Sequence, residues 1–229
     1  MIPRVIHQTW RDADLPAPFA RLAESWRRHH PEWQWRLWTD ADNRAFVTEH
    51  FPDMLALYDR YPHPIQRVDM VRYLILHTHG GLFVDLDFEA LRPLDPHLAG
   101  DCVFGAEPAE NCAAHGMVEI VSNAFMAARP GHPLLRAIIA SLPEAFSTAQ
   151  AHGLDRNRAI LETTGPFHLT RCVSAYGGAE AVTILPSETL YPLGISDIEA
   201  LRRTGWDDAL RARLSRACAV HYHAGTWWR

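Results

Sequence analysis

The sequence predicts an α/β protein in which a central sheet is flanked by helices. Along the chain, short segments with strand character alternate with segments in which apolar residues recur at helical spacing. One strand segment, residues 82–88, has the β-branched and aromatic character of a strand buried inside a helix-covered sheet. The chain has 229 residues, of which 48% are hydrophobic, so we expect one domain with one large core over residues 1–229.

The N-terminal part predicts a strand, a helix and a second strand in turn. Residues 4–10 have strand character, and residues 16–30 have the spacing of a helix with one apolar face. Residues 33–38 alternate aromatic and polar side chains at period two, which indicates a strand. Thr39 and Asp40 follow, and such side chains cap helix N-termini, so we expect another helix there.

The central segment predicts a helix that leads directly into a buried strand. Residues 64–79 are apolar on nearly every side; Pro64 suits the start of this helix, and Gly80 and Gly81 suit its end. Residues 82–88 follow as the strand. The polar segment 106–116 predicts a surface loop near the functional site. The other expected elements are strands at residues 102–105, 120–125, 182–185 and 219–223, and helices at residues 132–146, 166–175 and 207–216.

Composition excludes several classes of protein. The net charge of -5 and the absence of a basic run argue against nucleic acid as a partner. The chain contains no lysine, which excludes a P-loop lysine and Schiff-base catalysis. The four cysteines form no C-x-x-C pair, so we expect reduced thiols rather than a zinc or redox motif.

No segment has the pattern of a signal peptide or of a membrane-spanning helix. The longest apolar region, around residues 68–76, is interrupted by Asp69 and Arg72 and is too short to span a bilayer. We therefore expect a cytoplasmic protein, and leave open a peripheral contact with the inner face of the membrane.

Asp85 and Asp87 form a D-x-D motif within the predicted strand 82–88. Side chains two residues apart on a strand share one face, so both carboxylates can point the same way while Leu86 faces the core. Two such carboxylates suit a divalent cation, Mn²⁺ or Mg²⁺, that neutralises a diphosphate. The alternative is that the aspartates only end a strand. The apolar approach to the motif favours the metal, because a buried carboxylate pair is costly without a counter-charge. Glu89 is a weaker candidate for a third ligand.

Asp69 and Arg72 form a second polar pair, on the predicted helix 64–79. Their spacing of three residues puts them on one face, among apolar neighbours. One interpretation is a self-contained ion pair. The other is that Arg72 supports the diphosphate or a sugar hydroxyl while Asp69 accepts hydrogen bonds from the sugar ring.

Both ends of the chain carry aromatic and polar groups that suit a ligand. A strand over residues 219–223 would place His221 and His223 on one face, and Gly225 would let Thr226 and a tryptophan approach a ligand. A packed terminal strand is the alternative. At the N-terminus, the tetrapeptide His7-Gln8-Thr9-Trp10 follows the first strand, where a nucleotide base could stack or hydrogen-bond; a core tryptophan is the alternative.

These segments together resemble the family-thirty-two glycosyltransferases, which have a sugar-binding region with a DxD motif and include fungal mannosyltransferases and bacterial capsule and lipopolysaccharide enzymes. The most specific similarity is to the family's central signature, at residues 67–73 and 80–87. The other matching segments, in order, are residues 2–10, 38–40, 122–127, 130–133 and 164–166, and His221 with Thr226 and Trp227.

The resemblance implies a GT-A-type, Rossmann-like fold with a mixed central sheet, a UDP- or GDP-linked sugar donor, a divalent metal and retention of anomeric configuration. It implies metal ligands at Asp85, Asp87 and His221, and catalytic roles for Asp69, Arg72 and Asp87. The implied substrate-binding residues are His7, Gln8, Thr9, Trp10, Asp69, Arg72, Asn123, Gly165, Thr226 and Trp227.

The expected reaction is transfer of the sugar to a glycan, lipid-linked or other hydroxyl acceptor. Attack on the front face would let the leaving diphosphate oxygen take the acceptor's proton, while the metal and Arg72 stabilise its charge. The short chain, without the membrane anchor of the fungal members, favours a bacterial enzyme of surface polysaccharide synthesis. Two rival functions are a metal-dependent nucleotide-sugar hydrolase and a non-catalytic nucleotide-sugar-binding module.

Overall fold

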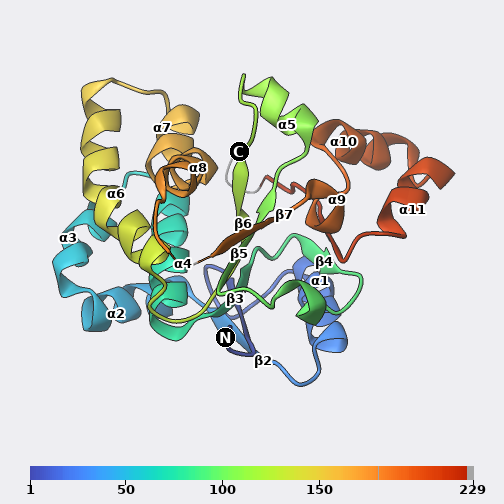
Figure 1. Ribbon diagram of the computed structural model, residues 1–229, viewed down its shortest axis with the longest axis horizontal. Helices are drawn as coiled ribbons and strands as arrows, with labels where there is room; N and C mark the ends of the chain where they lie inside the picture. Colours follow the sequence, from blue (N-terminus) through green and yellow to red (C-terminus); the bar gives the residue numbers. More distant parts are fainter. Residues whose placement is uncertain (180, 226–229) are drawn as a thin grey trace.

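A six-stranded mixed sheet forms the centre of the protein (Figure 1). The computed structural model describes residues 1–179 and 181–225. The strands, in spatial order, are β2 (Gln34–Trp38), β1 (Val5–Thr9), β3 (Gly81–Val84), β6 (Val121–Ala128), β5 (Cys102–Ala106) and β7 (Val182–Leu185). Only β6 runs antiparallel to its neighbours, so the predicted mixed sheet is confirmed. A separate two-stranded ribbon pairs β4 (Phe88–Ala90) with β8 (Ala219–His221).

Helices cover both faces of this sheet (Figure 1). One layer contains α2 (Asp40–His50), α3 (Pro52–Arg60), α4 (Pro64–His79), α6 (Pro133–Ala151), α7 (Arg156–Thr163) and α8 (Pro166–Ala175). The other side contains α1 (Ala17–His29), α9 (Ser187–Leu190), α10 (Ile195–Thr204), α11 (Asp208–Leu214) and the β4–β8 ribbon. The short helix α5 (Ala109–Ala114) follows β5, and a 3₁₀ turn spans Asp95–His97.

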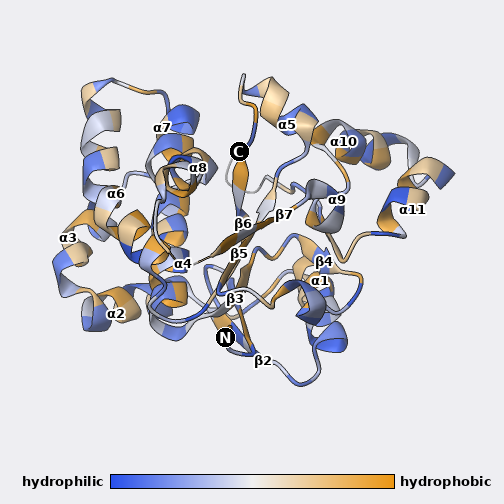
Figure 2. Cartoon of the chain, viewed as in Figure 1, coloured by the Kyte–Doolittle hydropathy of each residue, from blue (hydrophilic) through white to orange (hydrophobic). Residues whose placement is uncertain are grey.

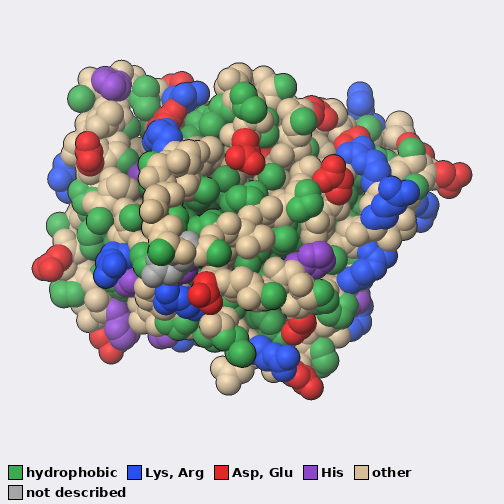
Figure 3. Space-filling model, in the orientation of Figure 1, with side chains coloured by type: hydrophobic (Ala, Val, Ile, Leu, Met, Phe, Trp, Pro, Cys, Tyr) green, Lys and Arg blue, Asp and Glu red, His purple; other side chains and the backbone are tan. Residues whose placement is uncertain are grey.

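Two hydrophobic cores lie on the two faces of the sheet. On β3, Phe83 joins the core under α4 and α6, while Leu82 and Val84 join the core that contains Trp26 of α1. Side chains alternate in this way because successive strand residues point to opposite faces. The central strands are accordingly apolar on both sides, and polar residues concentrate on the outer sides of the helices (Figure 2). Arginines gather over α10 and α11 on the face shown in Figure 3.

The helix α4 has the predicted bounds, and the turn after it brings its buried face close to the end of β3. Gly80 ends the helix with a φ of 63°, and a Cβ there would lie 2.6 Å from Cδ of Pro130. Gly81 has a φ of 99°, so neither position accommodates a larger side chain without strain. Because no linker separates helix and strand, Arg72 on α4 lies beside Asp85.

The predicted strand 82–88 is wrong in its continuity. β3 ends at Val84, and β4 begins at Phe88 in a different sheet. Between them, residues 85–87 form a turn closed by a hydrogen bond from the Phe88 amide to the Asp85 carbonyl (3.2 Å). The two aspartates therefore do not share a strand face; they converge through the turn. Leu86 is buried, as predicted.

Other differences concern segments with weak local signals. The helices α3, α7, α9 and α10 were not predicted, and the expected loop 106–116 contains α5. The expected strand 219–223 ends at His221, because His223 has a positive φ of 43°. The free thiols of all four cysteines are confirmed. In the described ranges, no helix has both the length and the apolar character needed to cross a bilayer.

Candidate active site

A cleft of about 950 Å³ opens at the edge of the sheet where β1, β2, β3 and β5 have their carboxyl ends. Its walls include Trp10 after β1, the turn at residues 85–87, Asn123 at the start of β6, and His221 at the end of β8. In open α/β sheets, ligands bind at this edge because the strand ends expose polar groups there. The cleft is therefore the candidate site.

Three ligand groups converge in the cleft: atoms of Asp85, Asp87 and His221 lie within 4.8 Å of one another. Nε2 of His221 lies 3.1 Å from Oδ1 of Asp87, and the Ala224 amide donates to the other oxygen of Asp87 at 2.8 Å. The His221 ring is fixed by stacking on Phe88, with 4.5 Å between centroids and an interplanar angle of 10°. β4 and β8 pair Phe88 with His221, so the sheet register creates this cluster.

Neighbouring charged groups and burial together set the ionisation of this cluster. Burial alone would raise the pKa of Asp87, but the neighbouring His221 holds it well below its ordinary value of 3.8. Burial alone would lower the pKa of His221, but Asp87 raises it above 6.5. Burial raises the pKa of Asp85 to about 6, although Arg72 opposes the shift. Asp87 is thus the most strongly ionised group of the three.

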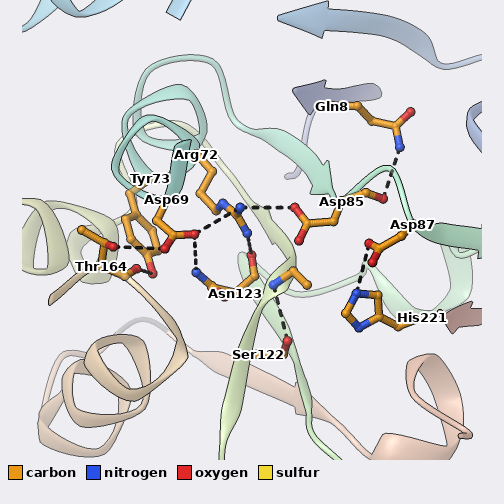
Figure 4. Close-up of polar contacts among 11 residues, drawn as sticks. Gln8, Asp69, Arg72, Tyr73, Asp85, Asp87, Ser122, Asn123, Thr164 and His221 are labelled. Atoms are coloured by element: carbon orange, nitrogen blue, oxygen red, sulfur yellow. Dashed lines mark hydrogen bonds and ion pairs between the residues drawn. The ribbon is translucent and has the colours of Figure 1, made fainter. Parts of the chain in front are cut away.

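Arg72 contacts both Asp69, its predicted partner on α4, and Asp85 of the aspartate turn (Figure 4). It is 1% exposed, and its Nη2 lies 3.2 Å from Oδ1 of Asp69 and 3.3 Å from Oδ1 of Asp85. Its Nη1 donates to the Asn123 carbonyl at 2.6 Å. The ion pair of Asp69 and Arg72 is therefore present but not self-contained, because the guanidinium also orients Asp85.

Asp69 lies behind Arg72, away from the cleft wall. Its carboxylate accepts hydrogen bonds from Nδ2 of Asn123 and from Oγ1 of Thr164, both at 3.0 Å (Figure 4). Asp69 thus contacts the side chains of Arg72, Asn123 and Thr164, and it holds Arg72 and Asn123 in position. Gly165 comes next in the chain and packs closely on α7, where a Cβ would lie 3.0 Å from Cα of Leu161. Its neighbour Pro166, not Gly165, lines the cleft.

Two residues of the predicted N-terminal tetrapeptide line the cleft, and the other two are buried behind it. Thr9 and Trp10 line the cleft, and Trp10 packs on Phe19 with 5.1 Å between ring centroids. Gln8 is fully buried and donates to the Asp85 carbonyl at 3.4 Å, so it supports the backbone of the aspartate turn (Figure 4). His7 is also buried, with Nε2 3.0 Å from the Gly80 carbonyl. Neither His7 nor Gln8 reaches the cleft surface.

His7 makes stability dependent on pH. Its Nδ1 accepts from the Trp38 indole at 3.1 Å, so protonation would break this contact, and burial lowers the pKa of His7 to about 4. The unfolded chain takes up this proton near pH 6.5, before the folded protein does, so stability is lost as pH falls from 6.5 to 4. The slope from one group is at most about 1.4 kcal/mol per pH unit. We expect denaturant unfolding of His7→Gln to show a weaker pH dependence than wild type in this window; an equal dependence would contradict the assignment.

Some residues of the cleft were not singled out from the sequence. Glu107 and Asn111 line it from the segment that was expected to be a loop near the site, and Nδ2 of Asn111 donates to Glu107 at 2.8 Å. Arg202 lines it from α10 and donates to the carbonyls of Tyr222 and His223. Glu89, the weaker ligand candidate, instead accepts from the Tyr222 hydroxyl at 2.6 Å. Thr226 and Trp227 lie outside the described residues.

The mixed sheet and the aspartate turn at its edge define the class: the fold is that of a GT-A-type glycosyltransferase. Mouse xyloside xylosyltransferase 1 shares this fold with a TM-score of 0.52 and 11% sequence identity, over 99% of this chain and 99% of that chain.

Residues 16–104 match the family model described as a glycosyltransferase sugar-binding region containing a DXD motif. Inositol phosphoceramide mannosyltransferase 1 of Schizosaccharomyces pombe is 37% identical over 191 residues, covering 81% of this chain and 56% of that protein. Inositol phosphoceramide mannosyltransferase 3 of the same yeast is 34% identical over 177 residues, covering 76% and 46%. The chain spans about half the length of these curated relatives. It belongs to this DXD-containing glycosyltransferase family.

Proposed function

We propose that the protein is a metal-dependent, retaining glycosyltransferase that uses a UDP- or GDP-linked sugar as donor. The observation that carries the proposal is the convergence of Asp85, Asp87 and His221 on the cleft, beside a buried arginine. Two carboxylates that face a diphosphate without a cation would repel it, so the arrangement makes chemical sense with a divalent ion.

The residues present fit such an ion. The donor set of two carboxylates and one imidazole combines oxygen and nitrogen ligands, which favours Mn²⁺ over Mg²⁺, an ion that prefers oxygen alone. The 3.1 Å between Nε2 of His221 and Oδ1 of Asp87 would let both atoms bind one ion. A bound cation would neutralise the charge that develops on the departing diphosphate.

The chain's own residues would then orient the reacting groups. Arg72 holds Asp85 in place, and Asp69 holds both Arg72 and the side chain of Asn123. Trp10 and Thr9, at the β1 side of the metal cluster, offer a surface for the nucleoside. Asn123 and Glu107 line the cleft on the β6 and β5 side, and we propose that they contact the sugar and the acceptor. The proposed retention rests on the family resemblance and implies front-face attack.

For the sugar and the acceptor, the names of the relatives support mannose and an inositol phosphoceramide-like lipid. We propose a lipid-linked acceptor on this basis. The expected role in bacterial surface polysaccharide synthesis and the cytoplasmic location stay predictions.

Donor binding should depend on metal. We expect titration calorimetry to detect binding of either UDP or GDP in the presence of Mn²⁺, and the affinity to fall by about tenfold or more in chelator. The better of the two nucleotides identifies the donor class. Equal affinity with Mn²⁺ and with chelator would remove the metal clamp from the proposal.

The rival functions differ in what the protein does with a donor sugar. A hydrolase would release free sugar at full rate without acceptor, and a binding module would bind the donor without turnover. A transferase should form a glycosylated lipid in detergent, with free sugar as a minor product. Nuclear magnetic resonance of the earliest product then tests whether its anomeric configuration matches that of the donor.

A further inference from the structure

The segment of residues 195–216, which contains α10 and α11, exposes apolar side chains at both ends of α10. Among the described residues, Ile195 and Trp206 are two of four large hydrophobic side chains that are exposed, at 43% and 38%. Trp206 directly follows Gly205, which ends α10 with a φ of 77°. The two helices pack on β8 through buried Ile198, Leu210 and Val220, so this exposure belongs to an ordered part of the fold.

The second part of this segment is basic in a chain of net charge -5, whereas its first part contributes Asp197 and Glu199. Residues 202–216 contain five arginines against two aspartates. Asp207 is used as the cap of α11, and Arg213 pairs with Asp197 at 2.8 Å. The exposed side chains of Arg203, Arg211 and Arg216 have no carboxylate within ion-pair distance in the described part of the chain. Arginine side chains accordingly gather over α10 and α11 in Figure 3.

This surface is continuous with the candidate active site. Ile195, Ile198, Glu199 and Arg202 of α10 line the cleft. The N-terminus of α10 is fixed to α5, because the Ile195 amide donates to Asn111 and the Ser196 amide donates to Glu110. One helix therefore forms both the wall of the cleft and part of the basic surface.

Exposed arginines on a helix are usually only solvated, and the overall negative charge argues against a nucleic acid partner. Arginines without a carboxylate partner, in the same segment as an exposed tryptophan, instead suit a lipid surface. Tryptophan favours the boundary between lipid head groups and acyl chains, and basic side chains are attracted to anionic lipids.

We propose that the α10–α11 surface docks on an anionic membrane and so presents the cleft to a lipid-linked acceptor. The proposed membrane docking is argued only from the arginines and Trp206. The presentation of a lipid acceptor rests on the proposed function.

Vesicle sedimentation tests the docking without donor or acceptor. One set of vesicles contains phosphatidylcholine alone, and the other contains phosphatidylcholine with about one third anionic phosphatidylglycerol. Wild type should bind only the anionic vesicles, and less at high salt. The double variant Arg203→Glu, Arg211→Glu should lose at least about 25-fold in affinity, and Trp206→Ala several-fold. The matched control Arg28→Glu, Arg136→Glu makes the same charge change on α1 and α6 and should bind like wild type.

Absence of binding to anionic vesicles, or an equal loss in the control, would overturn the proposal. Equally tight binding to soluble heparin would overturn it too, because a general polyanion site needs no membrane. Transfer from donor to an acceptor in detergent separates the two proposals. Normal transfer without vesicle binding removes the docking and leaves the enzyme, whereas vesicle binding without transfer removes the enzyme and leaves the docking.

Discussion

Asp87→Asn is expected to reduce sugar transfer by at least about 100-fold, because loss even of a group that only supports a metal ligand costs 10- to 100-fold. Asn keeps the size of Asp87 and can still accept from the Ala224 amide, but it offers the cation no negative charge. The metal-free fold should lose modest stability, because the ionised carboxylate is favoured in the folded protein by His221. The assay measures transfer with Mn²⁺ beside the melting temperature in chelator.

Glu89→Gln provides the matched control for this variant. It makes the same chemical change two residues away, at a side chain that contacts Tyr222 and does not line the cleft. Its transfer rate should stay close to that of wild type. If Asp87→Asn is well folded and transfers sugar as fast as Glu89→Gln, Asp87 has only a structural role and the proposed metal site is wrong.

Much of the fold could be predicted because its elements carry local signals. The bounds of α4 follow from Pro64 at its start and Gly80 at its end, and Thr39, one of the two residues expected to cap α2, is its N-cap. α7 escaped prediction although Asp155 caps it, because only a short apolar stripe of Ile160 and Leu161 packs inward. An apolar period needs more than two turns before it is distinct from chance.

The turn at residues 85–87 could not be predicted, because pairing with a distant strand decides it. The local sequence supports a continuous strand over 82–88, and Asp85 still bonds to Ala124 of β6. From Phe88 onward, however, the chain pairs with β8 near the other end of the sequence. That pairing bends the backbone at the aspartates and brings His221 to Asp87.

The candidate site shows the same division between local and long-range information. The spacing of Asp85 and Asp87 and the histidines of the C-terminal strand drew attention to groups that do converge. The sequence did not reveal that His7 and Gln8 are buried supports, because their burial depends on Trp35 and Trp38 of the neighbouring strand. It also left the partner of Arg72 open, since Asp85 becomes its neighbour only through the Gly80–Gly81 turn.

Arg72→Lys is expected to lower the transfer rate by about 10- to 100-fold although the positive charge remains. The guanidinium serves Asp69, Asp85 and the Asn123 carbonyl at once, through two separate nitrogens. A lysine has a single nitrogen and a more strongly hydrated charge, so it cannot serve all three positions. Lysine tests this better than an apolar residue, because removing the charge would leave two carboxylates uncompensated at a cost of about 3–5 kcal/mol.

Arg67→Lys is the matched control, one helical turn and a half earlier on α4. Arg67 donates to the Tyr61 carbonyl at 2.8 Å and does not line the cleft. We expect its rate to be close to that of wild type, while Arg72→Lys shows a lower kcat at saturating donor. Melting temperatures of both variants separate the fold from the reaction. If Arg72→Lys melts earlier but turns over normally once folded, Arg72 only stabilises α4 against the sheet. A kcat that falls at temperatures where the variant is fully folded means that Asp85 must be held by the planar guanidinium for transfer to proceed.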